Sequence, residues 1–166
     1  GAITETVNLN GQTQVATTKQ YLRINRTYVV TAGSGGTGAG VIYVATSGAA
    51  SGVPTGTAYA AIVAGENQSQ MAVYTVPAAY SLYIDNVYFT AAVSATTNHV
   101  IAKLATRDLN GVFRSKTTNV LENSPLINNF EFPLKVNAKT DIECRASGST
   151  TNNQVSASFE GALIAD

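Results

Sequence analysis

Apolar and polar residues alternate in short runs along most of the chain, and this period of two predicts β-strands. Near the beginning, Ile3, Val7 and Leu9 alternate with polar residues, and Asn10-Gly11 then offers a tight turn. No window carries the apolar i, i+3, i+4, i+7 spacing of an amphipathic helix. The further runs that we expect to be strands are 21–31, 41–46, 57–64, 70–76, 81–94, 99–107, 112–117, 129–136, 140–146 and 154–164.

Four of these runs make definite predictions about faces and turns. In 81–94, strict alternation puts Leu82 and Ile84 on one face and Tyr83, Val87 and Phe89 on the other. The runs 99–107 and 112–117 flank an Asn-Gly pair and predict a hairpin. The last run places one apolar set on a single side: Val155, Ala157, Phe159 and Leu163.

Short strands at regular intervals, separated by turn residues, predict an all-β fold. We expect a single-domain antiparallel β-sandwich that is jelly-roll-like, with a barrel as the structural alternative. A parallel α/β fold is disfavoured because no helical crossover lies between the strands. Residues 1–20 are expected to form an N-terminal arm or an edge strand, and residues 21–166 the sandwich. The glycine-rich segment 33–40 is too short to be a domain linker.

Charge is distributed very unevenly along this sequence. Residues 27–65 contain no Lys, Arg, Asp or Glu, whereas residues 103–166 hold 14 of the 20 charged side chains. Only 12% of the residues are charged, against about a quarter in an average globular domain. Because buried charges are costly, such a surface suits a part that neighbouring subunits cover. The sequence therefore favours a role in assembly.

Other classes of partner are disfavoured. The formal net charge is zero and no basic stripe is present, so binding to nucleic acid through phosphate neutralisation is not expected. No apolar run is long enough for a membrane helix, and residues 2–14 do not resemble a signal peptide. The single cysteine excludes an intrachain disulfide and fits assembly in a reducing cytosol, with a disulfide-free secreted protein as the alternative. Gly1 is either a tag remnant or a processed terminus, and the sequence does not separate the two.

Three features of the sequence resemble parts of catalytic or nucleotide-binding sites, and each has a simpler structural interpretation. Residues 33–38 match G-x-G-x-x-G, but a strand-like run follows where a dinucleotide site needs a helix, so we interpret them as an inter-strand loop. His99 is the sole histidine and no G-x-S-x-G motif accompanies it. Cys144 alternates with Ile142 in an expected strand, which points its thiol toward the core. We expect no enzyme activity and no cofactor.

Carboxylates could also act in pairs or bind a metal. Asp141 and Glu143 lie two residues apart and would share one strand face, with Lys139 and Arg145 as nearby partners. A glycosidase pair would instead flank a sugar from opposite sides. Asp108 begins a sequence that faintly resembles a calcium loop, but the later ligands are missing, so a turn is expected and no metal site.

Seven of the eight tyrosines lie in the charge-poor half of the chain. A tyrosine offers a large apolar body with a polar tip, so such residues serve in cores, in subunit interfaces or on a ligand-binding face. For the subunit interface we select Tyr28, Tyr43, Tyr59 and Tyr74.

Four segments after Ala32 form a distinctive pattern: 68–78 (QSQMAVYTVPA), 111–114 (GVFR), 132–135 with 139–143 (FPLK and KTDIE) and 155–160 (VSASFE). This pattern, from Ala32 to the C-terminus, resembles virion structural proteins of tailed bacteriophages. The residues before Ala32 match this pattern less clearly.

The resemblance implies a non-enzymatic component of the virion, assembled in the host cytoplasm. The expected role is an oligomeric capsid decoration (cement) or head-fibre protein that stabilises the phage head. Its expected partners are itself, as a homotrimer, and other virion proteins such as the major capsid protein. The alternative is a tail-fibre or neck module that binds a receptor or carbohydrate, and head, neck and tail placements all remain open.

Overall fold

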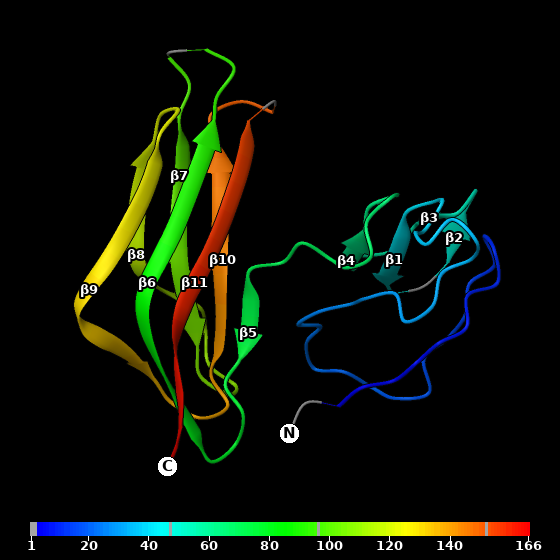
Figure 1. Ribbon diagram of the computed structural model, residues 1–166, viewed down its shortest axis with the longest axis horizontal. Coiled ribbons are helices and arrows are strands. Elements are labelled where there is room, and N and C mark those ends of the chain that lie inside the picture. Colours follow the sequence, from blue (N-terminus) through cyan, green and yellow to red (C-terminus); the bar gives the residue numbers. More distant parts are fainter. Residues whose placement is uncertain (1–2, 47, 96, 152) are drawn as a thin grey trace. The chain divides into compact units, whose positions relative to one another are not determined.

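The computed structural model describes residues 3–46, 48–95, 97–151 and 153–166. All of its regular secondary structure is β, and every strand pairing is antiparallel. The described part of the chain contains no helix that could cross a bilayer. Two compact units are present, an N-terminal unit of residues 2–71 and a sandwich unit of residues 72–166 (Figure 1). This division falls between Met71 and Ala72, whereas the sequence interpretation divided the chain after residue 20.

The N-terminal unit is built from two small hairpins and long extended segments. The expected strands at 41–46 and 57–64 form one hairpin, in which β1 (Ile42–Ala45) pairs with β4 (Ala58–Ile62). The loop between them contains a second hairpin of β2 (Ala49–Ala50) and β3 (Val53–Pro54). The side chains of Ala60 and Ile62 are buried in this unit.

Two expected strands of the N-terminal unit do not form. Residues 3–9 belong to no strand, although the Asn10-Gly11 turn is present and Thr13 N donates to Asn10 O at 2.9 Å. The run 21–31 makes only an isolated bridge, between Tyr28 and Gln68. Both predictions were wrong because alternation specifies a suitable face but cannot supply the neighbouring strand that completes a ladder.

The sandwich unit consists of two antiparallel sheets (Figure 1). One sheet has the order β5-β10-β7-β8, and the other has the order β11-β6-β9. The strand bounds are Val73–Thr75 for β5, Tyr80–Ala92 for β6, Val100–Arg107 for β7, Arg114–Leu121 for β8, Pro125–Val136 for β9, Asp141–Gly148 for β10 and Gln154–Ala165 for β11. The predicted all-β sandwich is therefore confirmed.

The core of the sandwich lies between these two sheets. Its largest fully buried side chains include Phe89 and Ile84 from one sheet and Leu104 and Ile142 from the other. Burying a side chain of this size contributes about 1.5–3 kcal/mol relative to exposure. The expected hairpin is also present: β7 pairs with β8, Gly111 N donates to Asp108 O at 2.8 Å, and Asn110 has a φ of 61°.

One expected face assignment was wrong. Leu82, Ile84, Val87 and Phe89 are all buried, although strict alternation would place the first two opposite the last two. Opposite β11, Glu160 pairs with Asn86 and Gly161 with Ile84, so Asp85 is one extra residue of β6; opposite β9 the register shifts at the same point, where residues 130–133 of β9 lie between the paired positions. A β-bulge of this kind resets the alternation, and both halves of β6 turn their apolar side chains inward.

The strand order is that of a jelly roll with one strand missing. An eight-stranded jelly roll has four strands in each sheet, and its first and last strands are neighbours. Here the chain changes sheet at every connection except the β7–β8 hairpin, as a jelly roll does, but the second sheet has only three strands. The position beside β11, the last strand, is the one without a partner.

Candidate functional site

The predicted interface tyrosines are divided between the two units. Tyr28, Tyr43 and Tyr59 belong to the N-terminal unit and are exposed there, with 54% of Tyr28 and of Tyr59 accessible. Tyr74 lies in β5 of the sandwich and packs against its core. Three of the four tyrosines are therefore exposed enough to take part in an interface. The fourth, Tyr74, serves mainly in core packing.

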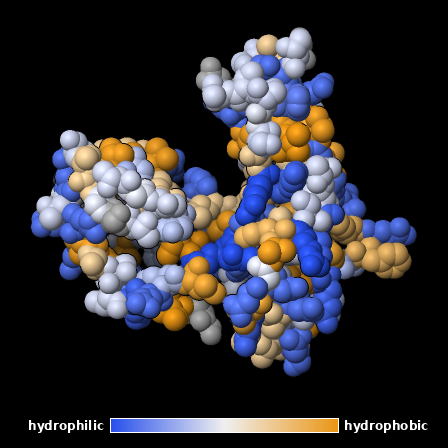
Figure 2. All heavy atoms as spheres, turned by 180° about the vertical axis from the view of Figure 1, so that it is seen from behind, coloured by the Kyte–Doolittle hydropathy of each residue, from blue (hydrophilic) through white to orange (hydrophobic). Residues whose placement is uncertain are grey.

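Large apolar side chains reach the surface of the N-terminal unit around these tyrosines. Apolar patches appear among near-neutral surface regions in the space-filling view (Figure 2). The exposed apolar residues between 22 and 63 are Leu22, Tyr28, Val30, Val41, Tyr43, Val53, Tyr59 and Val63. Since residues 27–65 carry no charge, this surface has the composition of a contact region rather than of a solvated one. We call these eight side chains the apolar surface of the N-terminal unit.

The second candidate is a groove at the open edge of the sandwich, beside β11. It has a volume of about 360 Å³ and is lined by Tyr74, Leu82, Phe159, Glu160, Gly161 and Leu163. Phe159, Gly161 and Leu163 share one face of β11, and Phe159 packs against the core, so this face points between the sheets. Tyr74 reaches the same space from β5 in the facing sheet. The groove therefore lies where an eighth strand would put its inward side chains.

The four edges of the two sheets are not equally protected against pairing. β5 has only three residues, β8 carries Arg114 and Lys116, and β9 contains Pro125 and Pro133. Short length, basic residues and prolines are the usual protections of a sheet edge. β11 has twelve residues, no proline and a single charged residue, Glu160. It is the least protected edge of the sandwich.

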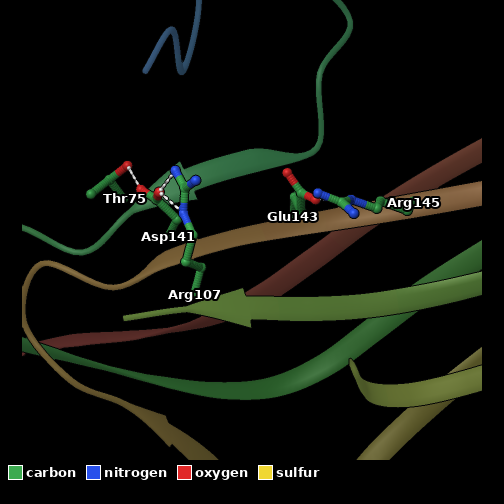
Figure 3. A network of polar contacts seen from close by, with 5 residues as sticks. All are labelled: Thr75, Arg107, Asp141, Glu143 and Arg145. Carbon is green, nitrogen blue, oxygen red and sulfur yellow. Dashed lines mark hydrogen bonds and ion pairs between the residues drawn. The ribbon is translucent and has the colours of Figure 1, made fainter. Parts of the chain in front are cut away.

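The paired carboxylates predicted from the sequence lie on one face of β10, where they form ion pairs (Figure 3). Asp141 is buried and accepts hydrogen bonds from Arg107 Nη2 at 2.5 Å, Arg107 Nε at 3.0 Å and Thr75 Oγ1 at 2.6 Å. Glu143 pairs with Arg145, as expected. For Asp141 the partner is Arg107 from β7 rather than the expected Lys139, since strand pairing places Arg107 directly opposite Asp141.

The Phe113 ring lies close to two guanidinium groups. Arg107 and Arg145 stand 4.6 Å and 4.4 Å from the centre of its ring. A second hollow of about 260 Å³ is lined in part by Lys103, Phe113 and Arg145. Cation–π stacking of this kind orders the arginines, and because Asp141 and Glu143 balance their charge, the face is a closed polar network rather than a strong anion site.

The residues weighed for catalysis are not brought together. Cys144 packs against the core, and burial raises the pKa of its thiol to about 11. At neutral pH it therefore remains a thiol, which is a poor nucleophile. Ser149 lies beside His99, but the contacts run through the His99 backbone: Ser149 Oγ accepts from His99 N at 3.0 Å. Within residues 3–46, 48–95, 97–151 and 153–166, no group of His, Cys, Asp and Glu could hold a metal ion.

Asp108 takes part in a turn, as the sequence predicts. Thr140 Oγ1 donates to Asp108 Oδ1 at 3.0 Å, which ties the β7–β8 turn to the start of β10. No pattern in the sequence indicates the groove beside β11, because only the strand order reveals that a neighbouring strand is missing.

Comparisons of this chain with protein-family models, with curated proteins and with solved structures found no match.

Proposed function

We propose that this chain is a non-enzymatic structural protein of a tailed-bacteriophage virion, and specifically an oligomeric capsid decoration protein that stabilises the head. The observation that carries the proposal is the apolar surface of the N-terminal unit, seven of whose eight side chains lie in a stretch of 39 residues, 27–65, without a single charge. Exposed apolar patches rimmed by polar residues mark contact sites. The resemblance of residues 68–78 and 155–160 to phage virion proteins supplies the location.

A decoration protein acts through binding alone. A subunit that binds only the assembled shell shifts the equilibrium toward that shell by mass action. Closed cyclic symmetry is usual for homo-oligomers, and local three-fold positions of a shell lattice suit a homotrimer. The expected partners are further copies of the chain and the major capsid protein.

Immunogold electron microscopy of the intact phage particle tests the location. Antibodies raised against the purified chain are expected to decorate the head, and boiled particles with released DNA serve as a control for antibody access. Label confined to the tail tip would overturn the decoration role and support a fibre module. An absence of label on both intact and disrupted particles would overturn the virion proposal as a whole.

One observation favours the alternative of a carbohydrate- or receptor-binding module of the tail or neck. Aromatic rings are exposed at Tyr28, Tyr59 and Phe132, and sugar-binding faces use such rings for stacking. A glycan array distinguishes the two functions: specific binding that is lost in Tyr59→Ala would support the module, and a decoration protein is expected to give no hits.

A further inference from the structure

The two edges of the sheet β11-β6-β9 carry complementary apolar features, a groove at one edge and a protruding side chain at the other. The strands β11 and β9 flank β6 on its two sides (Figure 1). No described strand pairs with the outer edge of β11. The groove at this edge is lined by Tyr74, Leu82, Phe159, Glu160, Gly161 and Leu163. It leaves apolar side chains uncovered where the strand order lacks a neighbour.

The protruding side chain is Phe132 on β9. It is 81% exposed, which is the largest exposed fraction of any large apolar residue in the described part of the sandwich. Phe130 and Leu134, two residues away on either side, pack against the core, and strict alternation would place Phe132 with them. The ring is instead held in solvent, although burying it would stabilise the protein.

An irregularity of β9 explains why Phe132 protrudes. Residues 130–133 of β9 lie opposite the single residue Asp85 of β6, so β9 bulges away from its partner at this point. Pro133 follows Phe132 directly and has no N–H, so it cannot restore the ladder there. Its fixed φ also stiffens the bulge. The Phe132 ring is therefore displayed on a stiff segment, and preorganisation of this kind favours binding.

The protruding ring and the groove lie at the same level along the strands. Gly161, which lines the groove, pairs with Ile84 of β6 on one side. Leu134, at the end of the β9 bulge, pairs with the same Ile84 on the other side. Two copies placed side by side can therefore bring Phe132 of one to the groove of the other without sliding along the strands. A rotation without such a shift closes into a ring, whereas a shift would build an open filament.

Phe132 cannot fill the groove of its own chain, so the two features can meet only between copies. Both belong to one compact unit, and they lie at opposite edges of one sheet with β6 between them. This holds for every placement of the N-terminal unit, because neither the groove nor the bulge includes any residue of that unit.

We propose that Phe132 of one copy inserts into the groove beside β11 of a second copy, and that repetition of this head-to-tail contact closes a ring. An aromatic side chain in an apolar pocket is a common anchor of protein–protein contacts. The ring is the homotrimer of the proposed function, so the inference deepens that function and rests on the self-association proposed there. Virion labelling tests the location of the protein and the experiments below test the contact, so each can fail without the other.

Site-directed crosslinking of the full chain tests the head-to-tail contact. In a Cys144→Ala background, a double variant carries Glu131→Cys beside the ring and Ala162→Cys beside the groove, both at exposed positions. A short bis-maleimide is expected to convert it into covalent dimers and trimers and no larger species. Each single variant is expected to give no covalent dimer, because a head-to-tail contact does not bring identical positions together. The control double variant, Val120→Cys/Ala162→Cys, places the first thiol on β8 in the other sheet and is expected to give none.

Three results of the crosslinking would overturn the proposal. A covalent dimer from Ala162→Cys alone would mean that β11 pairs with another β11. A yield from the Glu131→Cys/Ala162→Cys protein no greater than that of the Val120→Cys control would mean that the two edges do not meet. Covalent species that grow without limit would mean that the contact builds a filament instead of a ring.

A second measurement follows the affinity of self-association by sedimentation velocity. Phe132→Ala is expected to raise the dissociation constant by about 30-fold or more, as the loss of an anchoring aromatic side chain does. Ile127→Ala is the matched control, because Ile127 is 56% exposed on the same strand but lies outside the bulge. For this control a change of less than about five-fold is expected.

Both alanine variants are expected to keep the circular dichroism spectrum of the unmodified chain, because both side chains are exposed in the single chain. A loss of affinity in Phe132→Ala therefore reports on the contact and not on folding. A dissociation constant that Phe132→Ala leaves unchanged would contradict the proposal, and this is the result expected if the N-terminal unit of the same chain fills the groove.

Discussion

At the scale of single residues, Asp141 shows how a polar contact at the sheet surface stabilises the sandwich. The Asp141 and Glu143 side chains are similarly buried, at 10% and 12% exposure, but Asp141 accepts hydrogen bonds from Thr75 and from an Arg107 that is 31% exposed, whereas the partner of Glu143, Arg145, is 56% exposed. Buried charged hydrogen bonds contribute more than exposed ion pairs, because solvent screens the latter. The two carboxylates lie on one strand face, but we expect them to contribute unequally to the stability of the fold.

Removing each carboxylate should therefore lower the free energy of unfolding by a different amount. Asp141→Ala is expected to lower the free energy of unfolding by about 2 kcal/mol, since it leaves Arg107 and Thr75 without their shared acceptor. The matched control, Glu143→Ala, is expected to cost about 0.5 kcal/mol. Urea denaturation followed by circular dichroism measures both values, and equal costs would contradict the assignment.

Glu5 provides a pH-dependent contact in the N-terminal unit. The backbone N–H of Thr18 donates to its carboxylate, and with further hydrogen bonds from Lys19 and Tyr21 this lowers the pKa of Glu5 to about 2. A lowered pKa means that the charged form is favoured in the folded chain. The contact is therefore fully present above pH 4.5 and is lost as the pH falls through about 2.

Carbon-13 NMR of the Glu5 side-chain carboxyl checks this directly. The titration midpoint is expected near pH 2 in the unmodified chain and higher in Thr18→Pro, which lacks the N–H that is the largest single cause of the lowered pKa. A Glu5 midpoint near pH 4.5 would show that the Thr18 contact is absent.

Among the elements of the fold, β6 shows how a local irregularity organises the sandwich. The extra residue at Asp85 turns both halves of the strand toward the core, and Gly161 of β11 lies opposite Ile84 at the same point. A Cβ on Gly161 would overlap the backbone of Tyr83 and Ile84. The glycine is therefore required by the close approach of two strands at a bulge.

Substitution of this glycine tests the bulge. Gly161→Ala is expected to destabilise the sandwich by about 2 kcal/mol, because two backbones must separate to admit the methyl group. Gly40→Ala is the control: no atom lies within 4 Å of its added Cβ, and a change within about 0.5 kcal/mol is expected. Thermal unfolding of the two variants gives the comparison, and a stable Gly161→Ala protein would contradict the close approach.

At the scale of the whole molecule, the distribution of charge governs how the protein associates. The apolar surface of the N-terminal unit lies mainly in a charge-free stretch, while most charged side chains lie beyond residue 102. Contacts made by apolar side chains are not weakened by counterions, whereas those made by exposed charges are. Association through the proposed surfaces should therefore depend mainly on apolar burial.

This predicts a weak dependence of self-association on salt. Raising sodium chloride from about 50 mM to 500 mM shortens the Debye length by about three-fold, and the dissociation constant from sedimentation velocity is expected to change by less than about three-fold. Phe132→Ala, by comparison, should weaken the oligomer at either salt concentration. An oligomer that dissociates at 500 mM salt would point to an interface built on ion pairs.

The sequence by itself determined the fold class, since a period of two without helical spacing leaves only pleated sheets to bury the apolar side chains. It likewise determined the β7–β8 hairpin, through Asn110-Gly111, and the uneven charge. It could not determine that residues 21–31 lack a ladder, that Asp85 shifts the register of β6, or that Arg107 is the partner of Asp141. Only the tertiary structure decided these, because each depends on which strand lies alongside another, and a strand's neighbours are far away in the sequence. The open edge of β11 belongs to the same class: a missing neighbour becomes visible only once all the others are in place.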